Sequence, residues 1–249
     1  MHYITNSSPH NDFMNFAINH MGVSSIDFHN WEKVQESLYT NPMTITPMGS
    51  LTPMILEERR LNVTQLSVFD RMAMERVLFI SGVVNDRMSV TTIAQLEYLD
   101  SIGDADIKFY IDSPGGSVLS GLKIYDIMEY IKSDVSTINT GMAASMGSIL
   151  LGGGTKGKRF SLKHARTMLH QVSSGSSGVI QNLRISLAET EKYNTTLFDL
   201  LGKFADKPAE EVLLDADRDL WLSSQETLDY GLIDGIIIKK GGEILRKVV

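Results

Sequence analysis

The sequence predicts an α/β protein in which helices cover a parallel or mixed sheet. Short apolar runs typical of buried strands alternate with segments whose apolar residues recur every three or four positions, as on one helix face. The chain has 249 residues, 43% of them hydrophobic, which is enough for one large core. It has no cysteine and a net charge of −7, so disulfides, thiolate catalysis and Cys-ligated zinc are excluded. The acidic balance also argues against nucleic acid as a partner.

Residues 1–50 differ in composition from the rest of the chain, and we interpret them as a leader. They hold four of the six histidines at irregular spacing, without a carboxylate cluster, so we expect no metal there. They match neither a secretory signal nor a transit peptide. We expect a flexible leader or propeptide over 1–50, cut near Ser50 to Thr52, and a single folded domain over 51–249. No apolar run reaches a membrane span, and the lack of cysteine fits a reducing, cytoplasmic location.

The predicted elements alternate along the chain. Strands are expected over 76–84, over 107–111 with Ile107, Phe109 and Ile111 on one face, and over 135–140. Helices are expected over 89–102, with Ser89 as N-cap, and over 118–133. A helix over 179–204 would be about 40 Å long, more than a small domain covers, which points to a partner subunit. The expected apolar face of the helix over 89–102 comprises Val90, Ile93, Leu96 and Leu99. That of the helix over 179–204 comprises Ile180, Leu183, Leu187, Leu197 and Leu201.

One glycine-rich stretch imitates a nucleotide-binding loop. "GGGTKGKR", ending at Arg159, has the glycine and lysine spacing of a P-loop. Arg159 stands where a Ser or Thr would hold magnesium, and the stretch leads from helix into strand. We therefore expect no nucleotide there and no cofactor.

"GMAASMG", from Gly141 to Gly147, predicts a tight strand-to-helix bend around Ser145. Such an elbow presents a nucleophile beside the N–H groups of a helix start, although close helix packing is the commoner reason for so many small residues. A nucleophilic serine needs a base, and outside the leader the chain offers His164, in a polar turn, and His170, at the end of an apolar strand. The orienting carboxylate would be Asp215, Asp217 or Asp219, and periodicity does not choose among them.

Four motifs in the same order resemble the proteolytic subunit of the Clp protease family. They are "DSPGGS", "GMAASMG", "KGKRFSLKHARTMLHQ" and "DRDLWLSSQETLDYGLIDGI", and the resemblance covers Leu51 to Ile237. It implies a ClpP/crotonase-like spiral of repeated β-β-α units with a long protruding handle helix. It also implies a serine endopeptidase in which Ser145 is the nucleophile, His170 the general base and Asp219 the orienting carboxylate. The oxyanion hole would be formed by the N–H groups of Gly116 and Met146.

The resemblance further implies a homo-oligomer of two stacked heptameric rings. An AAA+ unfoldase ATPase of the Clp type would deliver unfolded protein substrates to the internal chamber. Asp217 and Arg218 would form a contact between rings. The ATPase would dock into a cleft that includes Lys108, Tyr110, Tyr130 and Phe160.

Three departures from the family pattern leave room for other interpretations. Asp112 stands where the family commonly has Asn, Val172 and Ser174 replace a proline and a glycine after "HQ", and Lys108 replaces a frequent aromatic residue. The long leader suggests, as an alternative, a viral capsid-maturation protease of the same fold. A catalytically silent structural ring subunit is a second alternative, which the complete Ser-His-Asp set argues against. Acyl-CoA-binding relatives of the same spiral fold lack such a triad.

Overall fold

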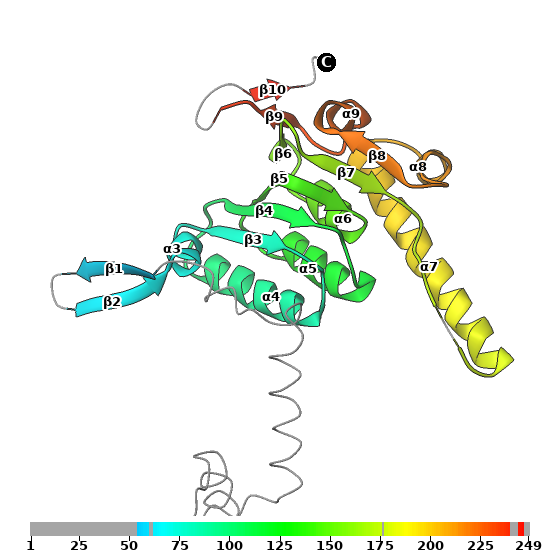
Figure 1. Ribbon diagram of the computed structural model, residues 1–249, viewed down its shortest axis with the longest axis horizontal. Helices are drawn as coiled ribbons and strands as arrows, with labels where there is room; N and C mark the ends of the chain where they lie inside the picture. The colour runs from blue at the N-terminus through cyan, green and yellow to red at the C-terminus, as the bar shows by residue number, and fades with distance from the viewer. Residues whose placement is uncertain (1–53, 60–61, 176, 240–243, 247–249) are drawn as a thin grey trace, which may run out of the picture. The chain divides into compact units, whose positions relative to one another are not determined.

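The computed structural model describes residues 54–59, 62–175, 177–239 and 244–246 (Figure 1). The predicted leader, 1–50, lies outside these residues. The chain divides into two compact units, Met1–Val68 and Phe69–Val249. In the first unit, β1 (Met54–Arg59) and β2 (Asn62–Ser67) pair in an antiparallel hairpin.

The second unit is built around a sheet with the strand order β10-β9-β6-β5-β4-β3. Neighbouring strands are parallel except at the β9–β10 edge, which is antiparallel. This sheet with its helical connections confirms the predicted α/β class. The strands are β3 (Val77–Ser81), β4 (Ile107–Ser113), β5 (Val135–Ala144), β6 (Arg159–Leu162), β9 (Gly235–Ile237) and β10 (Ile244–Arg246).

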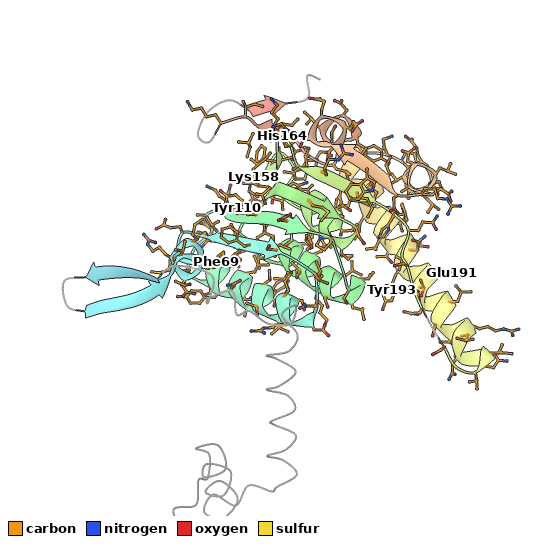
Figure 2. All side chains as sticks on the ribbon, viewed as in Figure 1. Phe69, Tyr110, Lys158, His164, Glu191 and Tyr193 are labelled. Atoms are coloured by element: carbon orange, nitrogen blue, oxygen red, sulfur yellow. The ribbon has the colours of Figure 1, made fainter. Side chains whose placement is uncertain are left out.

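Strand β4 shows why one face of the sheet is covered. Ile107, Phe109 and Ile111 are fully buried, as the sequence predicted, because alternate side chains of a strand point to one side. They belong to the same buried cluster as residues of α4 (Asp86–Ser101) and α5 (Val118–Tyr130). Lys108 and Tyr110 point to the opposite side, where Lys108 is exposed and Tyr110 is half-buried. Phe69 of α3 (Val68–Met74) packs on Phe79 at that side, with ring centroids 5.1 Å apart (Figure 2).

Helix α4 begins earlier than the sequence predicted, so Ser89 as its N-cap was wrong. The cap is Asn85, which has an extended backbone and accepts a 2.9 Å hydrogen bond from the Met88 N–H. Ser89 is fully buried inside the helix. Of the predicted apolar face, Leu96 and Leu99 are buried as expected and Ile93 is half-buried, whereas Val90 is 65% exposed. Ser89 and Thr92 complete the buried face.

Strand β5 has two different partners along the same edge. Residues 137–139 pair with β6, and residues 142–144 pair with β7 (Arg166–Leu169), which in turn pairs with β8 (Leu220–Ser223). The buried Asn139 lies at the change of partner, where its side chain donates to the Arg166 carbonyl and accepts from the Gly141 N–H. This arrangement gathers the ends of β5, β7 and β8, and these strand ends adjoin all three predicted catalytic residues.

The predicted long helix is α7 (Ile180–Ala205), and only its last third is buried. Leu197 and Leu201 contact the core, whereas Ile180 and Leu187 are 69% and 60% exposed. The first half of α7 therefore extends beyond the sheet (Figure 1). The remaining helices of the second unit are α3 (Val68–Met74), α6 (Met146–Gly152), α8 (Ala209–Asp215) and α9 (Ser224–Tyr230). None of the helices in the described ranges is long and apolar enough to cross a membrane.

The stretch that imitates a P-loop has a structural role. Arg159 is 4% exposed and forms a 2.7 Å ion pair with Asp234. Its guanidinium also donates to the carbonyls of Gly152, Phe204 and Gly231, at the ends of three helices. Burial raises the pKa of Asp234, but the hydrogen bonds from Arg159 outweigh burial and hold that pKa below its usual value.

Candidate active site

Ser145 occupies a strained bend between β5 and α6. Its φ is 53° and its ψ −124°, a conformation that residues other than glycine rarely adopt. The bend is held from both sides: the Ser145 N–H donates to the Met168 carbonyl at 2.9 Å, and the Ser145 carbonyl accepts from the Ser148 N–H and Oγ. Backbone strain of this kind persists only where the surrounding structure enforces it, and it recurs at active sites.

His170 reaches the serine from the neighbouring strand. It directly follows β7, and its Nε2 lies 2.9 Å from Ser145 Oγ. The histidine side chain is 28% exposed. This is the contact that a nucleophile needs with its general base. His164, the other candidate, lies in the exposed turn between β6 and β7 (Figure 2).

The three candidate aspartates have different partners. Asp219 Oδ1 lies 3.5 Å from His170 Nδ1, and its side chain is 62% exposed. Asp217 accepts a 3.4 Å hydrogen bond from Gln171. Asp215 accepts one of 2.8 Å from the Tyr230 hydroxyl, and burial together with this carboxylate raises the pKa of Tyr230. Of the three, Asp219 is the one that faces the imidazole.

The Ser-Pro-Gly-Gly turn lies against the serine bend. Gly115 and Gly116 have φ of 92° and 151°, which favour glycine. A Cβ on Gly115 would lie 2.6 Å from Ser145 Cβ and 2.9 Å from the Met146 nitrogen, so the two segments are in direct contact. Met146 is the first residue of α6, and the first N–H groups of a helix lack an intrahelical acceptor. Donors from both segments can therefore meet beside Ser145.

A small cavity of about 50 Å³ opens beside Ser145 and His170. Its lining combines Gly116, three further polar residues and five apolar side chains; the polar ones are Ser148, Gln171 and Ser173. An apolar side chain could lie against the apolar part while its backbone lies near the serine. The apolar lining consists of Val118, Ile149, Val172, Leu197 and Leu201.

The four residues of the predicted docking cleft separate into two groups. Tyr110 and Phe160 share one row across the sheet face that lies opposite α4 and α5, in the register Phe79, Tyr110, Ile138, Phe160. Lys108 is exposed on the same face. Tyr130 is 75% exposed at the end of α5, a helix that belongs to the covered face. A cleft with all four would therefore need two subunits.

Sequence reasoning missed two members of this row, Phe79 and Ile138. Phe79 packs edge-to-face on Tyr110 with ring centroids 5.4 Å apart. The alternation of "VLFIS" placed Phe79 opposite Leu78 and Ile80 and could have identified it. The predicted ring contact, Asp217 and Arg218, forms a 3.7 Å pair within the chain, and the Arg218 side chain is 94% exposed. Among the described residues, no group of three or more His, Asp or Glu could hold a metal ion.

A family model for Clp protease matches residues 60–240. The chain belongs to the Clp protease family. It is therefore a serine protease, a hydrolase of peptide bonds, with the fold of that family. The chain is 44% identical to the ATP-dependent Clp protease proteolytic subunit of Bacteroides fragilis, over 92% of this chain and 99% of the relative. It is 43% and 42% identical to proteins of the same name from Bacteroides thetaiotaomicron and Porphyromonas gingivalis, over 92% of this chain in both cases.

Proposed function

We propose that the chain is the proteolytic subunit of an ATP-dependent Clp protease, with Ser145, His170 and Asp219 as its catalytic triad. The single observation that carries this proposal is the 2.9 Å contact between Ser145 Oγ and His170 Nε2 at the strained bend. The 3.5 Å gap from His170 to Asp219 is longer than a hydrogen bond. Catalytic contacts are often longer without substrate and shorten in the reacting complex, which we expect here.

The proposed reaction follows from these positions. Ser145 Oγ attacks the scissile carbonyl carbon while His170 Nε2 takes its proton, and Asp219 stabilises the imidazolium that forms. The carbonyl oxygen becomes an oxyanion that accepts hydrogen bonds from the N–H groups of Gly116 and Met146. His170 then gives the proton to the leaving amine, and a water, activated by the same histidine, releases the peptide acid from Ser145.

The cavity beside Ser145 supports a preference for an apolar residue before the cleaved bond. Apolar side chains form about half of its lining and no carboxylate or lysine lies among the described residues that line it, so a charged side chain would lose part of its hydration there without gaining an ionic partner. Unfolded polypeptides expose apolar side chains, whereas folded proteins bury them. The site therefore fits an enzyme that acts on unfolded protein substrates.

We further propose that the subunits form two stacked heptameric rings supplied by an AAA+ unfoldase of the Clp type. The relatives are named ATP-dependent, whereas the stretch that imitates a P-loop in this chain has its arginine buried in an ion pair. ATP hydrolysis would therefore belong to a partner. We assign the exposed first half of α7 to the contact with the second ring. We assign the Tyr110–Phe160 row to the contact with the unfoldase.

The relatives also bear on the alternatives. Their alignments cover 92% of this chain, whereas residues 51–249 make up only about four-fifths of it, so part of the predicted leader is shared with them. This favours a bacterial Clp protease subunit over a viral capsid-maturation protease. The contact between serine and histidine argues against a catalytically silent structural ring subunit.

The deciding experiment is peptide hydrolysis by the assembled full chain. Ser145→Ala and His170→Ala should each lower the rate by about 10⁴- to 10⁶-fold, because the triad acts as a unit. His164→Ala, the control in the exposed turn, should retain wild-type activity. Negative-stain images would show whether the inactive variants still form rings. Near wild-type turnover by Ser145→Ala would remove the proposed function.

A further inference from the structure

One hydrogen bond joins the segment after His170 to helix α7. The Val172 N–H donates to Asn194 Oδ1 at 2.9 Å, and both residues are half-buried. Between the end of β7 at Leu169 and the start of α7 at Ile180, the described residues form no helix or strand. The β7–β8 ladder thus ends at the Leu169–Leu220 pair, just before His170, and after His170 a side chain from α7 supplies an acceptor for the backbone.

Asn194 is suited to this contact by its position. It lies in the middle of α7, next to Tyr193, which Figure 2 labels. Asparagine is a poor helix former because its side chain competes for backbone groups. Here that side chain bonds a backbone N–H outside its own helix. Valine at position 172 provides that N–H, which a proline would lack.

The same two elements both line the cavity beside Ser145. Val172 and Ser173 form one part of its wall, and Leu197 and Leu201 of α7 form another. The two leucines lie three and seven residues after Asn194, so all three share one face of the helix. Val172 also packs against the buried core cluster. The hydrogen bond is thus a polar tie between these two parts of the wall, two residues from the catalytic histidine.

We infer that Asn194 is a positioning residue for catalysis, an inference that rests on the proposed function. By holding Val172 on α7, it keeps His170 within reach of Ser145 and sets the width of the cavity beside Ser145. A displacement of α7 is transmitted through this bond to the histidine. Loss of the bond lowers the fraction of subunits in which Nε2 can accept the serine proton, so kcat falls.

A double-mutant cycle on the full chain tests the bond from both sides. Asn194→Leu replaces the amide acceptor with an apolar group of similar branching, and Val172→Pro removes the donor. The assay is hydrolysis of a fluorogenic peptide with leucine before the cleaved bond, expressed per assembled particle. We expect each single variant to lose five- to tenfold in kcat, where tenfold equals about 1.4 kcal/mol. The double variant should lose no more than either single, because both remove the same interaction.

Two further variants separate positioning from general stability. Asn194→Asp keeps an oxygen acceptor and should retain kcat within about twofold. Thr195→Val, one residue along α7, removes only a hydroxyl that bonds within the helix and should match the wild type. Hydrogen exchange followed by mass spectrometry gives a readout independent of activity: the Val172 amide should exchange faster in Asn194→Leu but not in Thr195→Val.

The outcomes are distinct. The inference is overturned if Asn194→Leu keeps kcat within twofold, or if the losses of the two single variants multiply in the double variant. If Asn194→Leu fails to assemble, the kcat values of the two single variants Val172→Pro and Asn194→Asp decide the question. The inference is then overturned if Val172→Pro keeps kcat within twofold. An active Ser145→Ala would instead remove the proposed function, whereas an inactive Ser145→Ala with an unaffected Asn194→Leu removes this inference alone.

Discussion

Tyr230 donates a 2.8 Å hydrogen bond to Asp215, and this contact occupies the first of the three aspartates that the sequence offers near β8. Asp219, four residues later, is left to face His170. The two carboxylates lie in one short segment but have different roles. The one that binds the tyrosine is structural, and the one that faces the histidine is proposed to be catalytic.

Asp219→Asn should lose most of the peptidase activity, about 10³-fold or more, because an amide can neither fix the imidazole tautomer nor stabilise the imidazolium. Asp215→Asn is the matched control and should lose little, since its partner Tyr230 lies away from the reaction. Steady-state hydrolysis of a model peptide measures both. The reverse order would show that the assignment of the carboxylate is wrong.

Gly115→Ala should lower kcat by about 100-fold or more. The added Cβ would meet both Ser145 and the Met146 nitrogen, so it would displace the proposed oxyanion donors. Gly157→Ala is the control because its φ of 89° is nearly the same but nothing lies within 4 Å of its Cβ. It should lower stability slightly and leave kcat unchanged. Equal losses of kcat in the two variants would trace the effect to backbone strain.

Asp234→Asn should destabilise the fold at pH 7 by about 3 kcal/mol, because it leaves the buried Arg159 without its partner. The pKa of Asp234 is lowered in the folded state, so its contribution is present above the unfolded pKa of about 4 and is lost as pH falls through the folded value. Thermal midpoints of wild type and variant should therefore differ most at pH 7 and converge toward pH 3.

Asp206→Asn is the control for this pH series. Asp206 pairs with Lys156 at 2.6 Å, but both side chains are 71% exposed. Exposed pairs contribute little, so its midpoints should follow the wild type closely. A constant difference between wild type and Asp234→Asn across the whole pH range would contradict the assigned pKa shift.

Arg218→Glu should shift the particle from double to single rings in sedimentation velocity. Arg218 lies 3.7 Å from its neighbour Asp217 and its side chain is 94% exposed, so it is available for a contact with another subunit. Lys163→Glu makes the same charge change in the exposed β6–β7 turn and should keep the double ring. An unchanged double ring in Arg218→Glu would remove this residue from the interface.

Lys108→Tyr should tighten binding of a hydrophobic-loop unfoldase by about five- to tenfold. Lys108 is exposed on the sheet face opposite α4 and α5, beside the row that holds Tyr110, and its ammonium can reach solvent while its methylenes stay on the sheet. An aromatic ring would add apolar area without a charge to desolvate. Surface plasmon resonance measures the affinity. An unchanged affinity would mean that this position does not face the docked loop.

The local sequence pattern was sufficient to predict structure wherever that structure depends on residues close together in the chain. The alternation of Ile107, Phe109 and Ile111 predicted the buried face of β4, and apolar spacing predicted α7 to within one residue at each end. The small residues around Ser145 predicted the tight strand-to-helix bend, because such a bend tolerates no large neighbours. The family resemblance, and not this stretch alone, proposed Ser145 as the nucleophile. The order of four motifs was sufficient to predict the family.

Tertiary structure decided what depends on residues distant in the sequence. Periodicity left three aspartates open, and only the family resemblance proposed Asp219. The structure gives the three different partners, because Tyr230 of α9 reaches Asp215 and His170, directly after β7, lies nearest Asp219. The start of α4 depended on which side chain could accept the Met88 N–H, and Asn85 does so three residues before it. The contact of Asn194 with Val172 spans 22 residues and leaves no periodic trace in the sequence. A pattern reports which face of an element is buried, whereas the partner of a polar group is set by how the elements pack.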